Sequence, residues 1–157
     1  MSIDSAAAEE LWKQYQAARP DAAAAAPDYT VERFGDSPQL ADDLLALVLA
    51  GIKRATSSLV ADFSAEGTPM PRIGGHWIVC DGAGTPRVVL RTTELRIGAF
   101  DSVDESFAHA EGEDERTREA WMREHRRYWQ RTNAGWTEAD EILFERFSVV
   151  FPPEVAD

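Results

Sequence analysis

A lysine and a threonine follow directly on an apolar segment, and their spacing suggests a site. The run "PQLADDLLALVLA" ends at Gly51, and Lys53 and Thr56 come next in the turn "GIKRAT". A lysine just past the end of a helix interacts favourably with the helix dipole without any further role. It can also bind an anion or, if burial removes its proton, act as a general base with the threonine hydroxyl as its partner. The second arrangement requires that the backbone bring both side chains to one side, and these residues alone leave the two alternatives open.

Carboxylates crowd together in the stretch "FAHAEGEDE". Glu111 and Glu113 flank Gly112, which lets the chain turn sharply and point the two side chains in different directions. Runs of charge usually face solvent. The functional alternative is that one carboxylate faces inward, has its pKa raised by burial or by its neighbours, and does acid–base or metal chemistry. The sequence leaves open which of the two takes the inward position.

An amphipathic helix is predicted beyond these carboxylates, in "RTREAWMREHRRYWQR". The segment holds six arginines against two glutamates, a net charge of +4 in a chain of −12. At helical spacing, His125 falls on an aromatic face, either as a hydrogen-bonded core histidine or as a neighbour of the substrate. The aromatic residues of that face are Trp121, Tyr128 and Trp129. The arginines of the opposite face, which could guide a nucleic-acid backbone, are Arg116, Arg123, Arg127 and Arg131.

The bulk composition bounds the class of protein. The chain has 157 residues, of which 44% are hydrophobic, so one domain of ordinary size is expected. No run approaches the ~18 apolar residues of a membrane span and the N-terminus lacks a positive signal region, so we expect a cytoplasmic protein without membrane contact. The formal charge of −12 argues against a protein that coats long stretches of phosphate backbone. A short nucleic acid or a nucleotide could still bind locally, near the basic helix.

Cysteine and histidine usage limits the metal sites. Cys80 is the only cysteine and lies in the apolar run "HWIVC", so neither a disulfide nor a thiolate cluster is expected. Histidines at 76, 109 and 125 show no spacing typical of zinc. A hard divalent cation held by carboxylates, Mn²⁺ or Mg²⁺, is the cofactor that the sequence allows. Ser57, Ser58 and His125 are not accompanied by a nucleophile elbow, so a serine-hydrolase triad is not predicted.

The elements that must position these residues alternate irregularly, which indicates the α+β class with a small mixed or barrel-like sheet. Helices are predicted at 5–18, at 37–50 with Ser37 as N-cap, and between 101 and 131 with a break at Gly112. Strands are predicted at 57–63, 76–81, 87–100 and 142–151. The second and third of these strands are joined by an Asp-Gly turn, which is typical of a hairpin. The segment "RPDAAAAAPD" is predicted to be a linker or a frayed turn, because prolines lie at both ends of its alanine run.

Taken together, these pieces resemble the ASCH domain, a compact β-barrel related to the PUA fold. The resemblance is carried by "FGDSPQLADDLLALVLAGIKRATSS", then "PRIGGHWIVCDGAGTPRVVLRTTEL", then "SVDESFAHAEGEDERTREAWMREHRRYW", and it covers roughly residues 32 to 150. It implies a small PUA-like mixed β-barrel flanked by helices, a cleft on one side, and a connection with RNA. The expected organisation is an N-terminal helix and linker in residues 1–28 and an ASCH domain in residues 29–157.

The resemblance also implies site residues. Short members of the family remove the acyl group from N4-acylcytidine nucleosides with a lysine and a threonine of a G-x-K-x-x-T turn and a glutamate after an "HAE" stretch, which correspond here to Lys53, Thr56 and Glu113. Members nearer this chain in length act as metal-assisted ribonucleases on single-stranded RNA. The residues expected to contact the substrate are Glu111, Arg123, Arg127 and His125.

The expected function is therefore hydrolysis of single-stranded RNA, in which Lys53 neutralises the scissile phosphate and Glu113, alone or with a divalent ion, activates water or the ribose 2′-hydroxyl. Two alternatives stay open at this point. The first is an amidohydrolase for N4-acylcytidine-type nucleosides, in which a deprotonated Lys53 serves as base and Glu113 protonates the leaving amine. The second is a module that binds RNA or a modified nucleotide without turnover.

Overall fold

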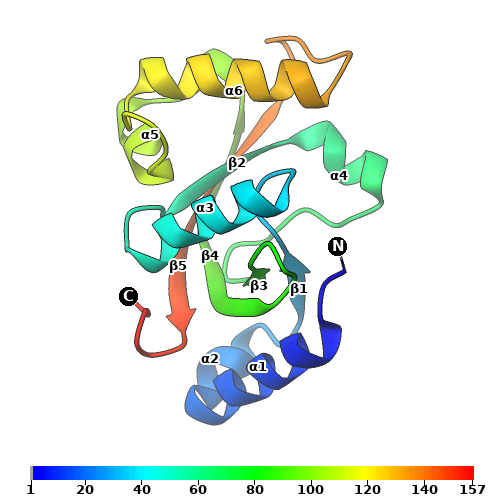
Figure 1. The fold of residues 1–157 in the computed structure, drawn as a ribbon, viewed down its shortest axis with the longest axis vertical. Helices are drawn as coiled ribbons and strands as arrows, with labels where there is room; N and C mark the ends of the chain where they lie inside the picture. The colour runs from blue at the N-terminus through cyan, green and yellow to red at the C-terminus, as the bar shows by residue number, and fades with distance from the viewer. Residues whose placement is uncertain (1) are drawn as a thin grey trace.

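A five-stranded sheet forms the centre of the molecule in the computed structural model, which describes residues 2–157 (Figure 1). Its strand order is β1-β3-β4-β5-β2, with β1 parallel to β3 and the other neighbours antiparallel. The strands are β1 (Tyr29–Glu32), β2 (Ala55–Leu59), β3 (His76–Cys80), β4 (Pro86–Gly98) and β5 (Ile142–Phe151). The long strands β4 and β5 bend the sheet into a half-barrel, and the predicted α+β class is confirmed.

Helices cover the sheet at both ends and along one side. They are α1 (Ser5–Ala18), α2 (Pro20–Ala25), α3 (Pro38–Leu49), α4 (Val60–Glu66), α5 (Glu105–Glu111) and α6 (Arg118–Thr132), with a short 3-10 helix at Phe100–Ser102. Figure 1 shows α5 and α6 at one end of the molecule, α1 and α2 at the other, and α3 between them. None of the helices in residues 2–157 combines the length and the apolar character that a membrane crossing requires.

The two faces of β5 supply two different cores. Ile142 and Phe144 pack with Trp121 of α6 in the core under α5 and α6. Phe147 and Val149 pack in a second core against α3. The site described below lies where these two cores meet, along the edge strand β2 and between α3 and α6.

The N-terminal helices pack on the same sheet. Trp12 and Tyr15 of α1 form a third core with residues of β3, β4 and β5. The hydroxyl of Tyr15 lies 2.9 Å from Nε2 of His76, and Nδ1 of His76 lies 2.9 Å from the carbonyl oxygen of Ala26. His76 thus joins β3 to α1 and to the C-terminal end of α2.

The alanine-rich segment was predicted to be a linker, and this is wrong for its central part. Residues 20 to 25 form α2, with Ala23 buried in the third core. The reason is that Pro20 occupies the first helical turn, where its fixed φ favours a helix and its missing N–H costs nothing. The division of the chain near residue 28 stays a prediction.

Local signals account for most of the other elements. The Ser37 hydroxyl accepts a hydrogen bond from the Leu40 N–H, so α3 begins where the cap was predicted. The hairpin of β3 and β4 is confirmed, with the Asp81 carboxylate accepting the N–H groups of Ala83 and Thr85. The strand predicted at 57–63 ends early, because the chain turns into α4 at Val60.

Candidate functional site

The turn after α3 carries Lys53 into the interior. Gly51 ends the helix with a φ of 80°, and the backbone N–H of Lys53 bonds to the Leu47 carbonyl at 3.1 Å. The backbone of the next residue, Arg54, is bonded on both sides. Its N–H donates to the Ala110 carbonyl, and its carbonyl accepts the N–H of Phe147. The turn is therefore pinned to α3, α5 and β5, and the Lys53 side chain is only 1% exposed.

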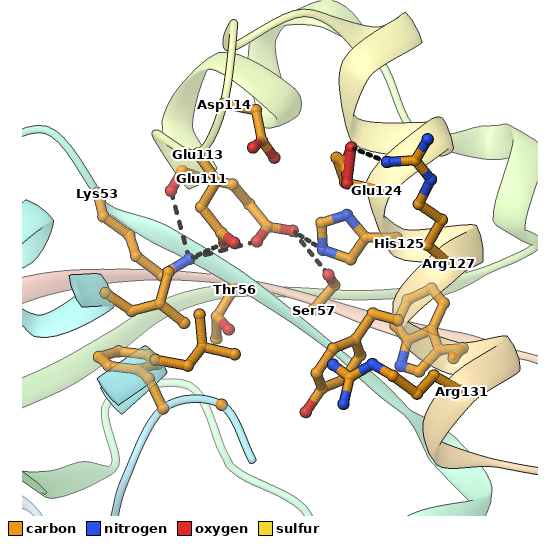
Figure 2. A pocket seen from close by; sticks show the side chains of 16 residues that line it. Lys53, Thr56, Ser57, Glu111, Glu113, Asp114, Glu124, His125, Arg127 and Arg131 are labelled. Carbon is orange, nitrogen blue, oxygen red and sulfur yellow. Dashed lines mark hydrogen bonds and ion pairs between the residues drawn. The ribbon is translucent and has the colours of Figure 1, made fainter. Parts of the chain in front are cut away.

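The Lys53 ammonium contacts both carboxylates of the "EGE" stretch. Nζ donates to Oε2 of Glu113 at 2.7 Å, and it lies 3.3 Å from Oε1 of Glu111 and 3.3 Å from the Glu111 carbonyl oxygen (Figure 2). Burial disfavours the ammonium charge, but Glu113 and Glu111 outweigh it and raise the pKa of Lys53. Lys53 is therefore a cation in the free protein, and the sequence-based picture of a deprotonated lysine is not supported.

Gly112 makes this double contact possible. It ends α5 in the left-handed conformation, with a φ of 75°. A Cβ atom at this position would lie 2.8 Å from the carbonyl oxygen of Ile52, so a larger residue would push the end of α5 off the Lys53 turn. The glycine thus lets the two flanking glutamates approach one ammonium group from different directions, as the sequence suggested.

Glu111 is the buried member of the pair and is almost fully saturated with donors. Its Oε2 accepts the Ser57 hydroxyl and the Trp121 indole N–H, each at 2.6 Å, and lies 3.5 Å from Nε2 of His125. Burial alone would raise the pKa of Glu111, but His125 and Lys53 outweigh it and hold the pKa of this carboxyl well below its usual range. Glu111 is therefore a fixed anion that positions its neighbours.

Glu113 is the carboxylate that faces the cavity, with 25% of its side chain exposed. Burial raises the pKa of Glu113 and the charge of Glu111 adds to this effect, whereas Lys53 opposes it. A carboxyl group with a raised pKa holds a proton more readily than an ordinary glutamate, which suits a group that takes up and returns one. Both carboxylates line the cavity, Glu111 as its fully buried member and Glu113 as the more exposed one.

His125 combines the two roles that the sequence allowed. Its Nδ1–H donates to the Trp121 carbonyl at 2.9 Å, and its ring stacks on the Trp121 indole with a centroid distance of 4.1 Å. Burial lowers the pKa of His125, but the carboxylate of Glu111 outweighs it and raises the pKa overall. His125 is thus held like a core residue and still lines the cavity beside Glu111.

These groups form the floor of a cavity of about 420 Å³, a size within the range of small-molecule sites. Thr56 lines it from β2, together with Ser57. Phe34, Leu40 and Leu44 form an apolar wall, and the Lys53 ammonium lies 5.5 Å from the centre of the Phe34 ring. The remaining walls come mainly from α6 and the loop before it, through Asp114, Glu124, His125, Arg127, Tyr128, Trp129 and Arg131.

The structure does not keep the four predicted arginines together on one helix face, as helical spacing had suggested. Arg127 and Arg131 line the cavity, although helical spacing had placed them opposite the aromatic face. Arg123 lies outside this cavity and pairs with Glu115 at 2.9 Å. Arg116 precedes α6, which begins at Arg118. Trp77 is buried in the α3 core and does not line this cavity.

Two groups of the site were missed at the sequence level. Ser57 was considered only as a nucleophile, and Trp121 only as a core aromatic; both donate to Glu111. The inward position of Ser57 could have been predicted. Side chains two apart in a strand share a face, and the neighbours of Ser57 on that face, Ala55 and Leu59, are apolar. Trp121 offered no comparable signal.

A divalent cation fits this site poorly. Ligand atoms of Glu111, Glu113 and His125 lie within 4.8 Å of one another, which is close enough for a metal. The Lys53 ammonium, however, already lies between the two carboxylates, and a cation there would face its positive charge at close range. The chemistry of the donor set therefore favours the lysine ammonium over a metal ion.

Comparison with known proteins identifies the family. A family model for the ASCH domain matches residues 30–151, so the chain belongs to the ASCH domain family, which is generally associated with RNA. An ASCH domain structure from Lactobacillus crispatus JV V101 superposes with a TM-score of 0.85 at 24% identity, covering 96% of this chain and 97% of that one. The structure of protein EF3133 from Enterococcus faecalis V583 superposes with a TM-score of 0.77 at 28% identity, covering 90% of this chain and 86% of that one. No match was found among curated proteins.

Proposed function

We propose that this ASCH domain is a hydrolase that removes the acyl group from a nucleoside amide of the N4-acylcytidine type. One observation carries the proposal: a lysine ammonium and a carboxyl group with a raised pKa touch at 2.7 Å on the floor of a small cavity. Such a pair supplies both requirements of amide hydrolysis, a stabiliser for the developing oxyanion and a group that moves protons.

The reaction proceeds in two steps. In the first, the Glu113 carboxylate takes a proton from water, the oxygen of that water forms a bond to the acyl carbon, and the carbonyl oxygen becomes an oxyanion facing the Lys53 ammonium. In the second, the C–N bond breaks as Glu113 returns the proton to the leaving amine. The products are the free amine and a carboxylic acid, so one water is consumed. The hydroxyl of Thr56, which also lines the cavity, orients the amide or the water.

The electrostatics of the cavity favour a substrate that is neutral at its reacting end. Glu111, Glu113, Asp114 and Glu124 all line it, and the whole chain carries −12. A phosphodiester placed at Lys53 would face these carboxylates at short range, whereas an amide would not.

Hydrolysis of single-stranded RNA is the second candidate. It is favoured by Arg127 and Arg131, which line the same cavity and could hold a phosphate. In that reaction Lys53 would neutralise the scissile phosphate and Glu113 would activate the 2′-hydroxyl.

A side-by-side assay separates the candidates. Purified protein is incubated with N4-acetylcytidine and with a labelled single-stranded RNA, each with Mn²⁺ or with EDTA, and the products are resolved by mass. The proposal expects cytidine and acetate, formed equally well in EDTA. Shortened RNA without deacetylation would favour the second candidate, and binding without any product would leave a recognition module.

The chain offers a matched control for the lysine. Lys13 is the only other lysine and lies on the surface of α1, paired with Glu9. Lys53→Met should abolish product formation and Lys13→Met should retain it. Deacetylation that persists in purified, folded Lys53→Met would refute the proposed mechanism.

A further inference from the structure

The cavity is chemically divided along α6. Figure 2 shows Lys53, Glu111 and Glu113 on one side of the cavity, and Arg127 and Arg131 on α6 on the other. Arg131 lies six residues beyond His125, which corresponds to roughly 9 Å along the helix axis. Tyr128 and Trp129 line the cavity between these two positions. The site thus has a proton-transfer end, an aromatic middle and a cationic end.

The two arginines are held only weakly by the protein. Arg131 pairs with Asp36 at 2.7 Å and is 61% exposed, and Arg127 pairs with Glu124 at 3.1 Å and is 72% exposed. Ion pairs at such exposed positions contribute little to stability, because water and salt screen them. A dianionic ligand can therefore replace these carboxylates at small cost to the fold.

The Arg131 guanidinium is also partly oriented. It lies over the Tyr128 ring, 5.3 Å from the ring centre, and its partner Asp36 follows directly after Gly35 of the cavity wall. An arginine that is stacked on an aromatic ring loses less freedom when it binds an anion. Guanidinium groups match phosphate geometry through paired N–H donors.

We propose that the substrate is a nucleotide rather than a nucleoside, with a phosphate group bound by Arg131 and Arg127 at the cationic end of the cavity while its base lies toward Lys53 and Glu113. In a nucleotide, the exocyclic amine of the base and the 5′-phosphate lie at opposite ends of the molecule, as the two ends of this cavity do. This inference rests on the proposed function, because it names the substrate class for the same site.

Equilibrium binding tests the inference without requiring turnover. The affinity of the full chain for cytidine is compared with that for cytidine 5′-monophosphate by calorimetry. The monophosphate should bind about tenfold more tightly or better, as expected for charge-assisted hydrogen bonds. The difference should disappear in Arg127→Ala/Arg131→Ala and persist in Arg87→Ala, where the lost arginine is exposed, pairs with Asp81 and lies outside the cavity lining. Circular dichroism verifies that each variant is folded.

A second variant works in the opposite direction. Asp36→Asn removes the carboxylate that competes for Arg131, so it should tighten binding of the monophosphate severalfold and leave cytidine binding unchanged. Equal affinities for the two ligands in wild type, no detectable binding of the monophosphate at millimolar concentration, or a preference that survives in the double variant would each overturn the inference.

Turnover separates this inference from the proposed function. If N4-acetylcytidine and its 5′-monophosphate are deacetylated with equal kcat/KM, the proposed function stands and the phosphate site is refuted. If neither is deacetylated but the arginine-dependent preference for the monophosphate is observed, the phosphate site stands and the hydrolase is refuted. A 3′,5′-linked dinucleotide is the third ligand: tighter binding than that of the monophosphate would assign the arginines to a phosphodiester of RNA and overturn the assignment to a mononucleotide.

Discussion

The indole N–H of Trp121 donates to Oε2 of Glu111 over 2.6 Å, and both residues are buried. The Ser57 hydroxyl donates to the same oxygen, and Lys53 lies 3.3 Å from the other one. A buried carboxylate with this many donors stays ionised and has little capacity to move a proton. In the proposed mechanism, Glu111 therefore fixes the charges around it and Glu113 is the carboxylate that transfers the proton.

Replacing Glu111 with glutamine should therefore destabilise the protein even though the shape is conserved. The new amide NH₂ would face groups that are themselves donors, and Lys53 would keep a single carboxylate partner. We expect a loss of about 2–4 kcal/mol in the free energy of unfolding, measured by urea denaturation. In the same variant the pKa of His125 should fall, because Glu111 is what raises it, and NMR titration of the imidazole reports this directly.

The control for that variant is Glu9→Gln, which changes an exposed carboxylate on α1. It should alter stability by no more than about 0.5 kcal/mol. An unchanged His125 titration in folded Glu111→Gln would show that Glu111 is not the group that controls the charge of the histidine.

Removal of the Lys53 ammonium should affect both stability and activity. In Lys53→Met, Glu111 and Glu113 lose their shared cation, so one of them must take up a proton or the fold must open. We expect kcat/KM for the acylated nucleoside to fall at least ~100-fold, the usual effect of losing a group that stabilises an oxyanion. Activity is measured below the melting temperature of the variant, so that unfolding does not contribute. A loss that Lys13→Met shares would point to a general effect of charge.

The pH dependence distinguishes a carboxylate base from a lysine base. The pKa of Glu113 is raised in the folded protein, and in the proposed mechanism its reactive form is the carboxylate. Activity should therefore rise with pH, with its midpoint above the ordinary value for glutamate of about 4.3. The pKa of Lys53 is raised as well and its useful form is the ammonium, so activity should fall only above the ordinary value for lysine of about 10.4. A pH–rate profile of kcat/KM that instead rises with pH above 9 would indicate that neutral Lys53 is the base.

Local sequence signals predicted the parts of this site that depend on local backbone, and failed where distant segments meet. Gly51 and Gly112 could be predicted as turns, because each needs a positive φ at the end of a helix. The role of Ser57 depends on the register of β2 against β5 and on the packing of α5 beside it, which no local pattern encodes. The cavity-facing position of Arg131 similarly depends on the loop at Asp36, which is 95 residues away in the chain. The family resemblance assigned Lys53 and Glu113 to one site but did not predict their contact. Sequence periodicity could not have done so, because the two residues are 60 positions apart.

A buried carboxyl group away from the cavity gives a last prediction, on stability. Glu145 of β5 is 7% exposed and accepts the Thr92 hydroxyl at 2.6 Å, and burial raises the pKa of Glu145 to about 7. The folded protein therefore keeps this proton at pH values where the unfolded chain, with a pKa near 4.3, has lost it. The folded state binds more protons, so Glu145 makes the free energy of unfolding fall as pH rises from about 4.5 to 7, and the penalty is complete above that range.

Glu145→Gln keeps an acceptor for Thr92 and cannot ionise, so it should stabilise the protein by about 2–3 kcal/mol at pH 8 relative to its effect at pH 4. Urea unfolding at the two pH values measures the difference, and Glu141→Gln, an exposed carboxylate just before β5, should behave like wild type. If Glu145→Gln has the same effect at both pH values, the carboxyl ionises equally in the folded and unfolded states, and the raised pKa is refuted.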